Sequence, residues 1–140
     1  MSNTPEKILE RWIDYVNKLD VENVIKLYDY KSTLLPTFVQ NSLSTPQQIK
    51  EYFKQLSARK NLRVDLHAET LKKYDIGENK YILLGTYSFR FIVDDASLTF
   101  PSRFTFILDI SRDNPILHHH SSQIPRTLSR GVSELHSSVD

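Results

Sequence analysis

The spacing of apolar residues changes once along this 140-residue chain, and this change constrains the fold more than any other feature. Before residue 60 the apolar residues recur at helical spacing, as in Ile8, Trp12 and Val16. After it they alternate with polar residues, which is typical of β-strands with one buried face. Helices followed by strands predict an α+β domain in which a long N-terminal helix and short helices pack on one face of a curved antiparallel sheet.

Capping residues place the helices. Thr4 and Pro5 suit the start of a first helix whose apolar stripe runs to Leu19, and a shorter helix is expected over 21–28. The segment "TPQQIKEYFKQL" predicts another helix, because Thr45 and Gln48 form a capping box and Pro46 fits the first turn. Strands are expected at 62–68, 81–93, 98–110 and 115–122, separated by the turns "IGEN", "DDAS" and "RDN".

Composition excludes several classes of function. We expect one domain, 1–125, followed by a flexible Ser-rich tail, 126–140. A net charge of +1 gives no reason to expect nucleic acid or a membrane as partner. The chain has no cysteine, which excludes disulfides and a Cys nucleophile and suits a cytoplasmic location. The N-terminus does not have the pattern of a signal peptide. Three glycines and no Gly-rich motif disfavour a phosphate-cradling loop.

Two stretches near the end of the chain carry a resemblance to a known family. "RFTFIL", a turn and "ILHHHSSQIP" resemble the C-terminal hairpin of the association domain of calcium/calmodulin-dependent protein kinase II. Upstream, "LDVENVIKLYDYKSTLLPT", "TPQQIKEYF" and "GTYSF" stand in the order seen in stand-alone relatives of that domain. The resemblance covers about residues 5–125. It also identifies the three consecutive histidines as native rather than as a purification tag.

The resemblance implies a fold and a range of functions. These domains belong to the nuclear transport factor 2-like (SnoaL-like) superfamily, in which a bent sheet and helices form a cone around a pocket. The kinase domain assembles into rings and has no catalysis of its own, and this chain lacks the kinase motifs. Other members are isomerases, cyclases and dehydratases. We therefore expect a non-catalytic oligomerisation and ligand-binding domain without cofactor, with a small isomerase or cyclase as the alternative.

The last two strands supply the candidate ligand-binding residues. Arg103, His118 and His120 match residues of the resembled hairpin, and a guanidinium in the cone could hold a carboxylate. Histidine adds hydrogen bonds that change with pH. Tyr15, Tyr87 and Arg90 complete the set of expected ligand-binding residues. His119 points the other way along the strand, toward a possible subunit interface. The alternative is that Arg103 is a structural residue paired with a carboxylate and that the histidines bridge backbone and hydroxyl groups.

Metal binding and acid–base catalysis find little support in the sequence. Neighbouring histidines on a strand diverge, so a metal site would need a third ligand from elsewhere, and none is expected. A catalytic base would have to be a carboxylate inside the cone. The candidate carboxylates each fit a solvated position better: Asp14, Asp29, Asp65 and Asp109.

Apolar residues on both sides of the sheet predict a homo-oligomer. Leu83 and Phe89 would lie on one face of the long strand, and Ile82, Leu84 and Ile92 on the other. Three short helices cannot cover both faces, so a second copy would bury the remainder. The alternative is a core that folds over both faces. By resemblance, the expected assembly is a dimer or a larger ring.

Overall fold

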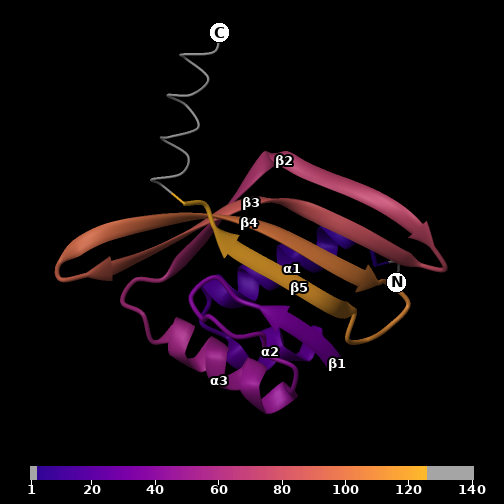
Figure 1. Cartoon of the computed structure of the whole chain (residues 1–140), viewed down its shortest axis with the longest axis horizontal. Helices are drawn as coiled ribbons and strands as arrows, with labels where there is room; N and C mark the ends of the chain where they lie inside the picture. The colour runs from indigo at the N-terminus through magenta and orange to yellow at the C-terminus, as the bar shows by residue number, and fades with distance from the viewer. Residues whose placement is uncertain (1–2, 126–140) are drawn as a thin grey trace, which may run out of the picture.

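Three helices and five strands make up the protein in the computed structural model, which describes residues 3–125 (Figure 1). The expected tail, 126–140, lies outside the described residues. The helices are α1 (Pro5–Asn17), α2 (Val21–Lys26) and α3 (Pro46–Ser57). The strands are β1 (Tyr28–Leu35), β2 (Arg63–Gly77), β3 (Lys80–Val93), β4 (Ala96–Asp109) and β5 (Ile116–Gln123). The predicted α+β class is confirmed. Strands β2 to β5 follow the helices as expected, but β1 lies between α2 and α3, so the expectation that all helices precede all strands is wrong.

The helix starts follow the capping chemistry of the sequence. The Thr4 side chain accepts a hydrogen bond from the Lys7 backbone N–H, and Pro5 occupies the first turn of α1. Thr45 and Gln48 form both bonds of the capping box at α3. The expected long N-terminal helix has 13 residues, only one more than α3 with its 12. The second helix ends at Lys26, so that Tyr28 begins a strand instead.

The strands form one sheet in the order β1-β5-β4-β3-β2. Strands β2 to β5 make the predicted antiparallel meander, and β1 adds to β5 in parallel. The register of β2 on β3 shifts between His67 and Lys72, and the Thr70 hydroxyl accepts the Thr86 backbone N–H there. Irregularities of this kind bend a strand and increase its twist. They give the sheet the curvature with which it wraps around the helices.

The two sides of the sheet have different surroundings. All three helices gather along one side, as Figure 1 shows. We call this helix-covered side the inner face; among its residues are Leu83, Tyr87, Phe89, Phe104, Phe106 and His119. We call the other side the outer face; it presents Ile82, Leu84, Arg103, Thr105, Ile107, His118 and His120. Core side chains from α1 and α3, such as Trp12 and Phe53, pack on the inner face.

A shift in the register of β4 on β5 reverses the side of the sheet that Ile116 faces. Ile107 pairs with His118, but Leu108 pairs with Ile116, so β5 carries one extra residue at Leu117. A strand with one extra residue turns the residues on either side of it to opposite faces. Ile116 is therefore buried in the core, whereas simple alternation placed it on the same side as His118 and His120.

Candidate functional site

A continuous chain of hydrogen bonds crosses the inside of the cone. The Trp12 indole N–H donates to the Tyr28 hydroxyl at 3.0 Å, and that hydroxyl lies 2.7 Å from Nδ1 of His119. Nε2 of His119 lies 3.0 Å from the Tyr87 hydroxyl, which donates to Ser121 Oγ at 2.6 Å. All five residues are buried. Helix α1 and strands β1, β3 and β5 each contribute to this interior hydrogen-bond chain.

The geometry assigns the position of each proton along the interior hydrogen-bond chain. The Tyr87 hydrogen is used toward Ser121, so the Tyr87 oxygen accepts from His119, and the proton of the neutral imidazole is on Nε2. Nδ1 is then an acceptor and takes the Tyr28 hydrogen. The Ser121 hydroxyl is left to donate to Thr37, which lies just beyond the end of β1. Every donor from Trp12 to Ser121 thus has one acceptor, and all bonds run in one direction.

Burial keeps this chain uncharged. Desolvation lowers the pKa of His119 well below its usual value, and the neighbouring His118 and His120 lower it further. Desolvation also raises the pKa of Tyr28 and of Tyr87 well above the usual value for tyrosine. The imidazole and both phenols are therefore neutral at physiological pH. Such a set can offer hydrogen bonds to a neutral polar group, and it carries no charge for an anion.

Aromatic rings fix the positions of these polar groups. The imidazole of His119 stacks on Phe106 with 3.9 Å between ring centroids, and Trp12 stacks on Tyr87 at 5.5 Å. Tyr87 in turn stacks on Phe104 at 4.6 Å. Stacked rings exclude water and restrict rotation, so His119 is held in one orientation.

The remaining space inside the cone is small. A cavity of ≈ 10 Å³ lies between the sheet and helices α1 and α3, with polar lining from Tyr87, His119 and Ser121. Its other walls are Trp12, Leu34, Pro36, Tyr52, Phe53, Leu56 and Phe89. This volume holds about one water molecule.

The residues predicted to bind a ligand are divided between the two faces. Tyr87 lies inside the cone. Arg103 is exposed on the outer face, and His118 and His120 are half-buried on the same face. All three lie outside the cone, because Phe104 and Phe106 occupy the inward positions of β4. The expectation that the guanidinium lies in the cone is wrong for this reason. Only His120 is near Arg103 in the register, whereas His118 pairs with Ile107 further along β4 and its Nδ1 lies 2.6 Å from the Thr33 hydroxyl.

Two further predicted residues have structural contacts. Arg90 forms an ion pair with Asp65 on the outer face, with 3.0 Å between Arg90 Nη2 and the carboxylate. Tyr15 is half-buried on α1 and packs against the core. Neither lies among the residues that line the cavity. Whether any of the six residues binds a ligand stays a prediction.

The expectation that His119 points toward a subunit interface is wrong, because the side of β5 opposite His118 and His120 faces the inside of the cone. His119 and Ser121 have the same parity on β5 and face the cone, with Phe106 and Phe104 as their partners on β4. Phe104 and Phe106 were recognisable as one apolar set, so the register of the hairpin would have placed His119 inward. Tyr28 could not be found in this way, since its strand pairs with a segment almost ninety positions away.

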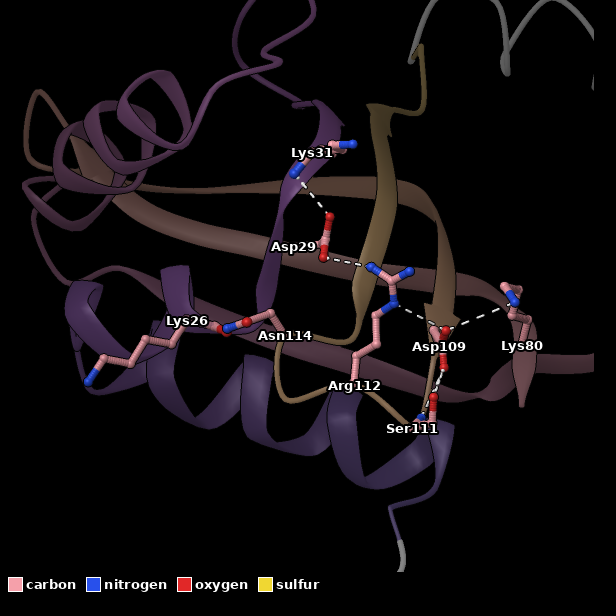
Figure 2. A network of polar contacts seen from close by, with 8 residues as sticks. All are labelled: Lys26, Asp29, Lys31, Lys80, Asp109, Ser111, Arg112 and Asn114. Atoms are coloured by element: carbon pink, nitrogen blue, oxygen red, sulfur yellow. Dashed lines mark hydrogen bonds and ion pairs between the residues drawn. The ribbon is translucent and has the colours of Figure 1, made fainter. Parts of the chain in front are cut away.

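A second polar cluster ties the β4–β5 loop to β1 (Figure 2). The Arg112 guanidinium lies 3.0 Å from Asp29 and 3.3 Å from Asp109. The Ser111 hydroxyl donates to Asp109 at 2.6 Å, and this bond is the main reason that the pKa of Asp109 is lowered. Both buried carboxylates are therefore satisfied by charges and donors at the rim of the sheet. They are not available as bases inside the cone.

Metal-binding groups and membrane-spanning helices are absent from the part of the chain that the structure describes. No three His, Cys, Asp or Glu side chains between residues 3 and 125 lie close enough together to hold a metal ion. In the same range, no helix combines the length and the apolar character that crossing a membrane requires.

Solved structures share this fold at low sequence identity. A Xanthomonas campestris protein, provisionally named a calcium/calmodulin-dependent protein kinase II association domain, superposes with a TM-score of 0.76 at 21% identity over 86% of each chain. An uncharacterised Caulobacter vibrioides protein with a cystatin-like fold superposes with a TM-score of 0.74 at 13% identity over 94% of each chain. SalBIII superposes with a TM-score of 0.69 at 11% identity, and the match covers 85% of this chain and 89% of SalBIII. SalBIII is an epoxide hydrolase/cyclase-like enzyme with a role in pyran ring formation in the polyether salinomycin.

Sequence comparison assigns the family. A search among curated proteins found no match. The family model of the calcium/calmodulin-dependent protein kinase II association domain matches residues 5–125, which include every helix and strand of the fold. The chain therefore belongs to the calcium/calmodulin-dependent protein kinase II association-domain family.

Proposed function

We propose that this protein is a non-catalytic assembly module that forms homo-oligomers through the outer face of its sheet and binds a small anionic ligand there. The observation that carries the proposal is that no helix or strand of residues 3–125 covers the outer face. Ile82, Leu84 and Ile107 lie side by side on β3 and β4, and all three helices lie on the other side of the sheet (Figure 1). Contiguous aliphatic residues without a covering element are typical of protein–protein contacts.

A second copy of the chain is the partner that fits this face best. The family is named for association, and a sheet face can pair with itself around a two-fold axis. The face also carries Arg103, His118 and His120, which supports an anionic ligand at the same surface. This location differs from the cone interior, whose polar groups are neutral.

Catalysis of the isomerase or cyclase type is the alternative, and one observation favours it. The Tyr87–His119–Ser121 cluster borders the interior cavity, and the cyclase-like SalBIII has the same fold. Against it, the residues that line the cavity include no carboxylate to act as base, and the cavity holds about one water. The interior therefore supports a structural role for these groups better than an acid–base role.

Sedimentation velocity of the full chain tests the assembly proposal. Leu84→Lys places a charge in the aliphatic part of the outer face and should convert the oligomer to monomer. Gln47→Lys makes a matched change at an exposed position of α3, and the oligomer should persist. Fluorescence of Trp12 and circular dichroism would show that both variants fold. A wild-type chain that is monomeric at high micromolar concentration would refute the proposal.

A further inference from the structure

Arg103 differs from other arginines of the fold in having no partner. Arg63 and Arg90 both lie within ion-pair distance of Asp65, and Arg112 holds Asp29 and Asp109. Arg103 is exposed on the outer face and makes no ion pair or side-chain hydrogen bond with any other residue in the range 3–125. Within the described part of the chain, its charge is therefore available to bind an added group.

The neighbours of Arg103 on the sheet are donors rather than carboxylates. Thr86 is its partner on β3 and Ser122 its partner on β5. Thr105 follows two positions later on β4, opposite His120. The three hydroxyls are half-buried and form no side-chain hydrogen bonds within the described chain. A guanidinium surrounded by free hydroxyl donors and an imidazole is suited to bind carboxylate oxygens.

The position of Arg103 in the sheet adds a symmetry argument. Strand β4 is the middle of the five strands, and Arg103 is close to the middle of β4. If two outer faces pair around a two-fold axis, residues near the centre of the face meet their own copies. Two guanidinium groups would then approach each other, and like charges oppose the contact unless an anion lies between them.

We propose that Arg103 and its equivalent in a second copy form one shared site for a small polycarboxylate, which bridges the two outer faces. This inference rests on the proposed function, because it needs the outer faces to pair. A dicarboxylate or tricarboxylate can offer one carboxylate to each guanidinium, whereas a monocarboxylate can neutralise only one of the two. The site is complete only in the oligomer, so that ligand binding and assembly stabilise each other.

Sedimentation velocity in citrate, acetate and chloride at matched ionic strength tests the shared site. We expect citrate to tighten self-association about tenfold relative to chloride, and acetate to have a much smaller effect. Arg103→Gln should change the strength of self-association in opposite directions in chloride and in citrate. In chloride it should tighten self-association, because the like charges are gone, and in citrate it should weaken it relative to wild type. Arg90→Gln, on the same face but already paired with Asp65, should keep the citrate response.

The outcomes separate this inference from the proposed function. Oligomers of equal affinity in citrate and chloride, or an unchanged citrate response in Arg103→Gln, would overturn the shared site and leave the assembly proposal standing. A monomer in all three salts would overturn both. Arg103 is exposed and makes no ion pair or side-chain hydrogen bond within residues 3–125, so its replacement should leave the fold intact, as the fluorescence of Trp12 would show.

Discussion

His119 Nδ1 accepts the Tyr28 hydroxyl at 2.7 Å, joining two residues that are 91 positions apart in the sequence. The bond connects the parallel pair β1–β5 at the point where α1 crosses it, since Trp12 of α1 donates to the same hydroxyl. One imidazole thus links the first helix, the first strand and the last strand. The stability of the cone should depend on it.

Replacing His119 by Phe should destabilise the fold by about 2–3 kcal/mol. Phe fills a similar volume and keeps the stacking on Phe106, but it leaves the Tyr28 hydroxyl without an acceptor and Tyr87 without a donor in the core. Urea unfolding followed by the fluorescence of Trp12 measures this loss. His120→Phe on the outer face, where His120 forms no side-chain hydrogen bond with residues 3–125, should change the free energy of unfolding by less than about 0.5 kcal/mol. Equal effects of the two substitutions would contradict a stabilising role for the interior hydrogen-bond chain.

The fold should lose stability as the pH falls below about 6.5. The pKa of His119 is lowered in the folded protein, so below its ordinary value of 6.5 the unfolded chain binds a proton that the folded chain does not. The loss approaches about 1.4 kcal/mol per pH unit until the folded pKa is reached. His118 contributes in the same direction, because desolvation lowers its pKa as well.

Unfolding of wild type and of His119→Gln between about pH 7.5 and pH 5 isolates this contribution, since above pH 5 most carboxylates stay ionised. Gln keeps one donor and one acceptor but does not titrate. The slope of stability against pH should therefore be smaller in the variant at equal protein concentration. The same slope in both proteins would show that the dependence comes from other groups.

The fold was predictable because its local signals agree. The caps at Thr4 and Thr45, the turns and the alternation in β3 all indicate the observed elements. The site was less predictable, for two physical reasons. Whether Arg103 or Phe104 faces the cone depends on which face the helices cover, and alternation alone does not decide that. The contact of Tyr28 with His119 depends on a parallel pairing of distant segments that has no local signal.

The Arg112 cluster should contribute a small, salt-sensitive stabilisation (Figure 2). Arg112→Met removes the cationic partner of Asp29, which keeps its hydrogen bond from the Lys31 backbone N–H, and one partner of Asp109. The guanidinium is half-exposed, so solvent screens much of the interaction. We expect a small fall in Tm that shrinks as NaCl is added. Asp29→Asn should partly restore the Arg112→Met variant, because it removes the unpaired buried carboxylate. If the changes in Tm caused by Arg112→Met and Asp29→Asn simply add in the double variant, the ion pair between the two residues does not contribute to stability.

Gly85 lies where the inner face leaves little room for a side chain. A Cβ there would lie 3.1 Å from Cζ of Phe104 and 3.1 Å from the Thr70 hydroxyl oxygen, which accepts the Thr86 backbone N–H. Gly85→Ala should therefore destabilise the fold by about 1–3 kcal/mol, since the Phe104 ring stacks on Tyr87 and has little freedom to move. Urea unfolding measures the loss. Phe104→Leu removes the crowding ring atoms, so adding Gly85→Ala to that variant should cost less than it does in wild type. An equal cost in both backgrounds would show that crowding by the Phe104 ring is not the cause of the loss.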